Sequence, residues 1–173
     1  FKYMFSDSGI VNYILVSINM IEKPIQWLTS TSMALPTVII TNIWVGIPFD
    51  MLLLSTGLSN IPSDVYESAT IDGAGCIQKF FYITLPMMTP VLFMNLLIGL
   101  IGAFKTFTQI KILTDGGPNN ASLVYMLYLY KNAFVNFRLG YANAMSVLLF
   151  VIVGALTILV YRSSSKWVFY GGE

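Results

Sequence analysis

Three long apolar runs constrain the fold of this chain more than any other feature of its sequence. They cover residues 34–58, 86–104 and 141–161 and carry few charged side chains. A helix needs about 20 residues to cross the hydrocarbon core of a bilayer, at about 1.5 Å per residue. In lipid, only helices and closed barrels satisfy their own backbone hydrogen bonds. The runs therefore predict an all-α fold, a polytopic transmembrane helix bundle.

The composition agrees with a membrane protein and excludes other classes. Of the 173 residues, 56% are hydrophobic and only 10% are charged, against about 25% charged in a soluble domain. A net charge of +1 gives no indication of nucleic-acid binding. There is no histidine, and the single cysteine, Cys76, excludes an intramolecular disulfide. We expect no catalytic residue and no metal site.

A polar loop at residues 61–86 separates the first two runs. Pro62 and Ser63 predict a helix start with Ser63 as N-cap. Asp64 and Glu67 then fall in the expected first turn, where the helix dipole favours anions. The loop should therefore begin with a short helix.

The second half of the loop predicts another short helix. Gly73 and Gly75 should end the first helix after about two and a half turns. Apolar residues at helical spacing follow, and Pro86 is expected to close this second helix. These apolar residues are Ile77, Phe80, Phe81 and Leu85. Two short helices joined by an Asp-Gly turn would form a compact knob.

The spacing in this loop resembles the EAA loop of permease subunits in binding-protein-dependent ABC importers. The family pattern stands here as residues 67–69 (Glu-Ser-Ala), 72–74 (Asp-Gly-Ala) and 83–86 (Ile-Thr-Leu-Pro), with Ser68 in place of the first alanine. The Leu-Thr-Asp-Gly-Gly-Pro turn at 113–118 is similar to the sugar-importer branch, which includes maltose-type permeases. Without this resemblance, the loop could equally be an amphipathic segment resting on lipid headgroups.

The resemblance implies an organisation and a set of coupling residues. Residues 1–173 would be the C-terminal part of an importer transmembrane domain, with further spans before Phe1. Residues 61–86 would form a cytoplasmic coupling loop. In it, Glu67 would pair with an ATPase arginine, Asp72 would orient the turn, and Gly73 would adopt a conformation that other residues disfavour. The full coupling set is Glu67, Ser68, Ala69, Asp72, Gly73 and Ala74.

The resemblance also implies partners and a location. The expected partners are a second homologous permease, two ATP-binding cassette ATPase subunits, an external substrate-binding protein and membrane lipid, with no nucleic acid. ATP and Mg would act on the ATPase, so the chain would bind no cofactor and would not be an enzyme. It would lie in a prokaryotic plasma (inner) membrane, with the 61–86 loop and the C-terminal tail in the cytoplasm.

A substrate pathway follows from the same resemblance. Its residues would be Asn42, Gly46, Phe49, Gly99, Gly102 and Thr106. The substrate would be a sugar or oligosaccharide, with glycerol phosphate or a polyamine as alternatives. The two span glycines could equally serve helix packing, and the partner permease could carry the site instead.

A secondary transporter that needs no ATPase is a more distant alternative. Such a protein would use ionisable residues within its spans, and Asp50 is the one candidate. We interpret Asp50 as a structural carboxylate hydrogen-bonded to a neighbour. Pro48 predicts a kink in the same span.

The remaining segments predict surface elements. Residues 1–33 should form an external segment. After the turn at 113–118, Asn119 or Asn120 should cap a helix on the membrane interface. Its apolar stripe would be Leu123, Met126, Leu127, Tyr130, Phe134 and Phe137. An interfacial tail would follow the third span, at Trp167, Phe169 and Tyr170.

The distribution of basic residues conflicts with the expected orientation. The side of the 61–86 loop holds 3 lysines and arginines and the opposite side holds 6, which would place the loop outside. Long loops count poorly under this rule, and the resemblance places the loop in the cytoplasm. We therefore expect the cytoplasmic orientation.

Overall fold

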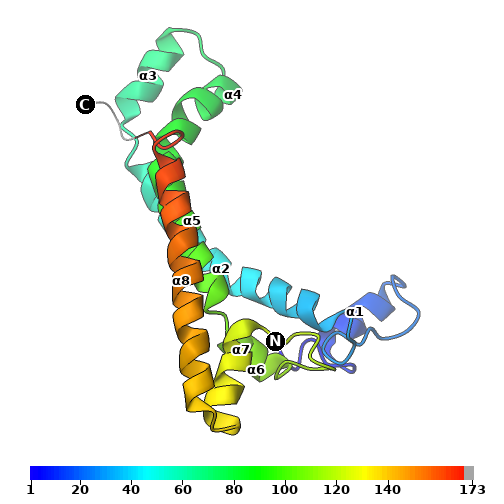
Figure 1. Ribbon diagram of the computed structural model, residues 1–173. Coiled ribbons are helices and arrows are strands. Elements are labelled where there is room, and N and C mark those ends of the chain that lie inside the picture. The colour runs from blue at the N-terminus through cyan, green and yellow to red at the C-terminus, as the bar shows by residue number, and fades with distance from the viewer. Residues whose placement is uncertain (170–173) are drawn as a thin grey trace. The chain divides into compact units, whose positions relative to one another are not determined.

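Figure 1 shows the computed structural model, which describes residues 1–169. The described residues form helices, turns and irregular segments, without a β-strand. Among residues 1–169, three helices are long and apolar enough to cross a membrane: Ala34–Ser59, Cys76–Phe104 and Leu139–Ser164. The first and third are α2 and α8. The predicted all-α fold with three spans is confirmed.

The chain divides into two compact units. The first contains residues 1–46 and 104–150, and the second contains residues 47–103 and 151 onward. Helices α2 and α8 contribute one half to each unit. Pro48 lies inside α2, next to the division, and the predicted kink there stays a prediction.

The first unit has a small apolar core between short helices. Besides the first half of α2, it contains α1 (Ile10–Ser17), α6 (Thr108–Leu113), α7 (Tyr125–Tyr130) and the π-helix η2 (Lys131–Val135). The core residues are Val38, Ile110, Leu113 and Leu127, with Leu28, Phe107, Leu123, Val124 and Tyr130 packed against them. Segments far apart in the sequence therefore share one core.

Asn12 holds the N-terminal segment of this unit together. Its side chain is only 2% exposed. The amide nitrogen donates to the carbonyls of Asp7 and Ile25, at 3.0 and 2.9 Å. The amide oxygen accepts from the Ile25 N–H and the Trp27 indole, at 3.0 and 2.9 Å. A buried amide is stable only when its donors and acceptors are paired, and this one is.

The connection before α8 differs from the prediction. Asn119 and Asn120 adopt left-handed conformations, with φ of 48° and 62°, so neither caps the helix that starts at Tyr125. The apolar stripe is also divided, because Leu127 is fully buried in the core while Phe137 is 81% exposed. The first part of the stripe packs within the unit, and only the last part is free to face a membrane interface.

The second unit contains the loop helices, α5 (Leu85–Phe104) and the second halves of α2 and α8. Helices α2 and α5 approach closely at Gly57, where an added Cβ would lie 2.9 Å from the Val91 side chain and 3.0 Å from the Met88 sulfur. In contrast, nothing lies within 4 Å of a Cβ built at Gly99 or Gly102. Within the described residues, a close contact between spans therefore occurs at Gly57, and the two alternatives for Gly99 and Gly102, helix packing or the pathway, both stay predictions.

Pro90 lies inside α5, and a threonine compensates for its missing N–H. In a regular helix the N–H of residue 90 would bond the Pro86 carbonyl. Here the Thr89 hydroxyl donates to that carbonyl at 2.6 Å. The same hydroxyl accepts the N–H of Phe169 at 2.8 Å, and Trp167 packs edge-to-face on Phe93. The tail after α8 is thus attached to α5. Tyr170, the last residue of the predicted tail, lies outside the described residues.

Candidate functional site

The 61–86 loop begins with helix α3 (Ser63–Ile71). Pro62 occupies the N-cap position in an extended conformation, and no side chain caps the helix. Ser63 is the first helical residue, and its hydroxyl donates to the Asp64 carboxylate at 3.3 Å. The prediction of Ser63 as N-cap is wrong by one position. In consequence Glu67 is the fifth helical residue, and only Asp64 lies in the first turn.

A Schellman motif ends α3 at the Asp-Gly turn. Asp72 is the C-cap and Gly73 follows with a φ of +78°. The Gly73 N–H bonds the Thr70 carbonyl at 3.0 Å, and the Ala74 N–H bonds the Ala69 carbonyl at 2.9 Å, which is the double pattern of this motif. Nothing lies within 4 Å of a Cβ added at Gly73. The turn therefore requires glycine for its backbone conformation and not for space, as predicted.

The second half of the loop is continuous with the second span. Helix α4 (Cys76–Lys79) starts after Gly75, whose N–H donates to the Gln78 side chain at 2.9 Å. The π-helix η1 (Phe80–Thr84) follows and leads directly into α5. The prediction that Pro86 closes this helix is wrong. A π segment shifts the hydrogen-bond ladder by one residue, and this shift next to Pro86 lets the helix continue through it.

Two side-chain hydrogen bonds attach α3 to this second helix. Tyr66 and Thr84 share a bond of 2.8 Å between their hydroxyls. Lys79 donates from Nζ to the Thr70 hydroxyl at 2.7 Å. Sequence reasoning missed these four residues, because their spacings of 18 and 9 positions have no local signature. With the Schellman turn, the two bonds make the loop a braced knob.

The surface of the knob combines one acidic side chain with large apolar ones. Glu67, Ser68, Asp72 and Gly73 are exposed, whereas Ala69 and Ala74 are half-buried. Within the described residues Glu67 makes no ion pair. Ile71, Ile77 and Tyr82 are 87%, 76% and 81% exposed. Exposed apolar side chains of this size are compatible with a surface that another protein or lipid covers.

The predicted pathway residues fall in both units, and their grouping around one pathway stays a prediction. Asn42, Gly46 and Thr106 belong to the first unit, whereas Phe49, Gly99 and Gly102 belong to the second. Asn42 donates to the Val38 carbonyl of its own helix at 3.1 Å, which leaves its amide oxygen as an acceptor. The Phe49 ring is 52% exposed.

Asp50 is half-buried in α2, and no hydrogen bond or ion pair holds its carboxylate within the described residues. The intrachain hydrogen bond that we expected for it is therefore not found there.

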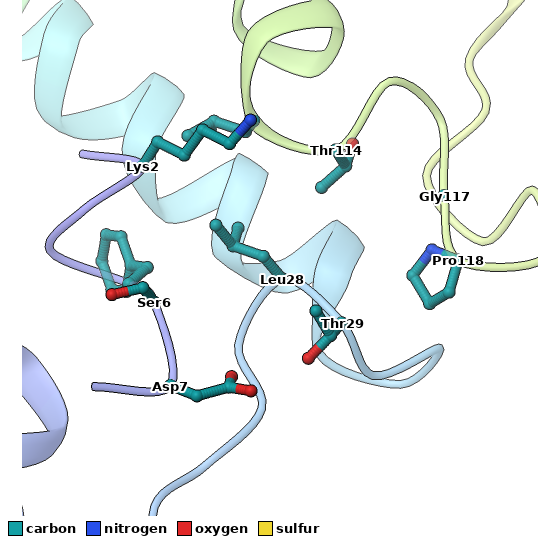
Figure 2. Close-up of a pocket in the computed structure, with 10 residues that line it drawn as sticks. Lys2, Ser6, Asp7, Leu28, Thr29, Thr114, Gly117 and Pro118 are labelled. Carbon is teal, nitrogen blue, oxygen red and sulfur yellow. The ribbon is translucent and has the colours of Figure 1, made fainter. Parts of the chain in front are cut away.

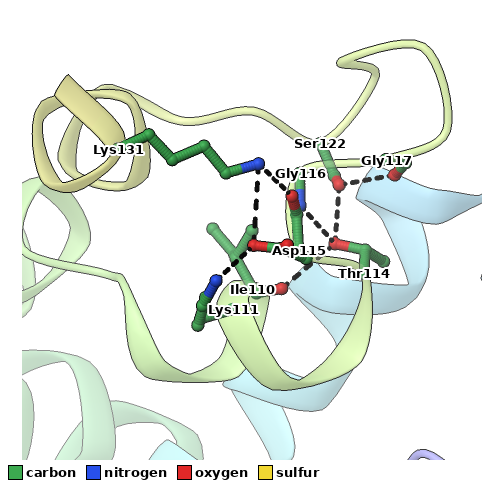
Figure 3. Close-up of polar contacts among 8 residues, drawn as sticks. All are labelled: Ile110, Lys111, Thr114, Asp115, Gly116, Gly117, Ser122 and Lys131. Carbon is green, nitrogen blue, oxygen red and sulfur yellow. Dashed lines mark hydrogen bonds and ion pairs between the residues drawn. The ribbon is translucent and has the colours of Figure 1, made fainter. Parts of the chain in front are cut away.

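The turn at residues 113–118 is held by two groups of polar contacts, shown in Figure 3. In one, the Thr114 and Ser122 hydroxyls share a bond of 2.7 Å, and Ser122 also donates to the Gly117 carbonyl at 2.7 Å. In the other, Lys111 Nζ lies 2.8 Å from the Asp115 carboxylate and Lys131 Nζ lies 3.6 Å from it. The hydrogen bond from Lys111 lowers the pKa of Asp115; burial opposes this shift, and the charges of Lys131 and Lys111 add to it.

Gly116 explains why the turn needs a glycine. Its φ is +86°, and an added Cβ would lie 3.1 Å from the Leu123 and Leu127 side chains. The turn is thus fixed to the core of the first unit.

Three apolar spans, the first two joined by a braced polar knob, are the arrangement expected of the membrane subunit of a transport system. Residues 7–169 match the family described as the binding-protein-dependent transport system inner membrane component. This chain belongs to that family, as the sequence resemblance implied.

Sequence similarity to individual permeases supports this assignment. The probable ABC transporter permease YesP of Bacillus subtilis (strain 168) is 41% identical over 98% of this chain and 55% of its own length. The trehalose/maltose transport system permease MalF of Thermococcus litoralis is 38% identical over 89% of this chain and 51% of its own length. The chain therefore spans about half the length of these relatives.

A solved structure has the same fold. It is a bacterial alginate ABC transporter in complex with a periplasmic protein that holds an alginate pentasaccharide. Its matching chain is 26% identical, with a TM-score of 0.85 over 98% of this chain and 59% of the other.

Proposed function

We propose that this chain forms part of the translocation pathway of an ATP-driven importer, for a sugar or oligosaccharide that an external binding protein delivers. A second permease subunit would complete the pathway, and two ATPase subunits would bind the knob. ATP and Mg would act on those subunits alone. The membrane would be a prokaryotic inner membrane, with the 61–86 loop and the C-terminal tail in the cytoplasm.

The braced knob is the observation that supports the proposed contact with the ATPase subunits. A part that transmits motion between subunits must keep its shape under load. The Schellman turn at Gly73 and the Tyr66–Thr84 and Lys79–Thr70 bonds provide this rigidity. The exposed Glu67 offers a carboxylate to a partner arginine, a charge-assisted and often bidentate contact. Exposed apolar side chains beside it would be covered by the same partner.

The relatives support a carbohydrate as the transported substrate. A trehalose/maltose permease and an alginate transporter both resemble this chain over most of its length. The spans themselves are poor in charge, since Asp50 is the only acidic residue in α2 and α5 has none. Glycerol phosphate or a polyamine would need a compensating charge along the pathway. A neutral sugar needs hydroxyl partners and an aromatic face, which Asn42 and Phe49 could provide.

The spans leave room for the proposed partners. Only 17%, 11% and 6% of the three apolar windows are buried within the chain. Lipid and neighbouring transmembrane helices would cover the rest.

An uptake assay tests the proposal. The full-length chain, co-expressed with its partner subunits, is placed in proteoliposomes that contain ATP and Mg. The binding protein is added outside with one labelled compound: maltose, trehalose, maltotriose, glycerol 3-phosphate or spermidine. We expect uptake of at least one sugar, and none when the vesicles contain ADP. Uptake of spermidine or glycerol 3-phosphate alone would contradict the substrate class, and uptake without ATP would contradict the importer class.

A further inference from the structure

The first unit contains a pocket of about 500 Å³ that none of the predicted pathway residues lines. Residues from three separate segments, at 2–7, 28–29 and 113–118, form its walls. Figure 2 shows these walls facing one another around a common space. We call it the three-segment pocket. Its volume lies within the roughly 300–1,000 Å³ that is usual for small-molecule sites.

Each wall of the pocket is held by its own contacts. The Asn12 side chain donates to the Asp7 carbonyl and accepts a hydrogen bond from the Trp27 indole. It thereby fixes both the first wall and the residue that precedes Leu28. The Phe5 ring packs edge-to-face on Trp27, with centroids 5.9 Å apart. Leu28 and Leu113 join the core of the unit. The pocket therefore exists before any ligand arrives, which reduces the entropy that binding must overcome.

The turn forms the third wall and is equally fixed. Gly117 and Pro118 line the pocket, and the Thr114–Ser122–Gly117 hydrogen bonds hold them. The turn at residues 113–118 therefore does more than reverse the chain direction, because it also forms part of a concave surface.

The lining has the two kinds of surface that a sugar ring requires. Lys2 provides an ammonium donor, Asp7 a carboxylate acceptor and Thr29 a hydroxyl that can do both. Within the described residues, neither Lys2 nor Asp7 forms an ion pair. Phe5, Leu28 and Pro118 provide apolar faces for the C–H side of a ring. Charge-assisted hydrogen bonds to sugar hydroxyls would be stronger than neutral ones.

The charges also indicate which ligand would fit. Lys2 and Asp7 carry opposite charges, so the two lining groups sum to zero. A phosphate group would be attracted by Lys2 but repelled by Asp7, and a polyamine the reverse, so neither gains a net attraction from the pair. An uncharged hydroxyl-rich molecule can use both groups at once.

We propose that the three-segment pocket binds one or two rings of an uncharged sugar before the substrate enters the membrane pathway. All three segments lie at the ends of the spans opposite to the 61–86 loop in chain order. With one bilayer crossing per span, chain order would put these ends on the side from which the binding protein would deliver its sugar. This inference rests on the proposed function and adds a second site to it.

Protection of an engineered cysteine tests the site. In a Cys76→Ala background, Thr29→Cys places a thiol in the pocket. Glu22→Cys, equally exposed and outside the pocket, is the matched control. The complete importer complex in proteoliposomes, without the binding protein, is labelled with a membrane-impermeant maleimide. The rate is measured with and without each compound of the uptake panel.

We expect the transported sugar to slow the labelling of Thr29→Cys at least threefold and to leave Glu22→Cys unchanged. Adding Asp7→Asn should restore the labelling rate. Asp7→Asn should also raise the sugar concentration needed for half-maximal uptake, whereas Glu22→Gln should not.

Three results would overturn the inference, and they separate it from the proposed function. If sugar uptake proceeds but no sugar protects Thr29→Cys, the pocket is not a sugar site although the importer assignment stands. If sugar alone gives no protection but a further sample with the binding protein added does protect Thr29→Cys, the pocket is a protein contact. If spermidine or glycerol 3-phosphate is the transported compound and protects Thr29→Cys, both the ligand class proposed here and the proposed function fail.

Discussion

Glu67→Ala offers the sharpest test of coupling, because the structure separates the two roles that its carboxylate could have. A helix-dipole role is worth about 0.3–1 kcal/mol and falls off beyond the first turn. Glu67 is the fifth residue of α3, so its dipole contribution should be close to zero. A carboxylate paired with a partner arginine at a shielded interface should instead cost about 2–5 kcal/mol when truncated.

This free energy converts into a large change in affinity. A loss of about 2 kcal/mol weakens ATPase binding roughly 30-fold, since about 1.4 kcal/mol corresponds to a factor of ten. Within the described residues Glu67 has no ion pair to lose, so the fold of the permease should be unaffected. We expect Glu67→Ala to lower both the amount of ATPase that co-purifies in detergent and the substrate-stimulated hydrolysis of ATP.

Asp64→Ala is the matched control on the same helix. Asp64 is exposed and lies in the first turn, so the dipole reading predicts a larger effect for Asp64→Ala than for Glu67→Ala. The coupling reading predicts the reverse order. Wild-type co-purification and stimulated hydrolysis in Glu67→Ala would refute the coupling role.

Four further experiments test other parts of the structure. Cys76 is exposed in the knob, so an impermeant thiol reagent should label it only after the membrane of intact cells is opened; ready labelling of intact cells would reverse the orientation. Asn12→Ala leaves several backbone groups of the first unit unpaired and should destabilise it by about 1–3 kcal/mol, seen as faster proteolysis of the N-terminal segment. Gly73→Ala forces a side chain into a left-handed conformation at about 1–2 kcal/mol and should reduce ATPase co-purification, whereas Gly99→Ala, with open space around it, should leave co-purification unchanged. Asn42→Ala should raise the substrate concentration for half-maximal uptake without reducing the amount of assembled complex; unchanged uptake kinetics would remove Asn42 from the pathway.

The spans were predictable because they depend on composition alone. Runs of apolar residues must be helical in a bilayer, whatever their neighbours are, and α2 extends only one residue beyond the predicted end at 58. The Asp-Gly turn was predictable for a similar reason, because a local motif with glycine at C′ has few alternatives.

Features that depend on distant residues were not predictable. Asn12 lies in an otherwise apolar stretch of sequence, yet its side chain accepts hydrogen bonds from residues 13 and 15 positions further along. A proline such as Pro86 usually ends a helix, but here the π-helix η1 precedes it and the helix continues into α5. The Tyr66–Thr84 bond likewise joins two helices whose relative position no spacing rule gives.

The continuity of α4, η1 and α5 has a mechanical consequence. A helix of 29 residues is about 43 Å long at 1.5 Å per residue. One end carries the knob and the other ends at the turn into the first unit. If a straight helix of this length tilted by about 5°, one end would move by about 4 Å relative to the other, roughly the diameter of a methyl group. The loop helix α4 and the span α5 therefore belong to one continuous helical segment, and the π segment is the stretch within it where the pitch differs.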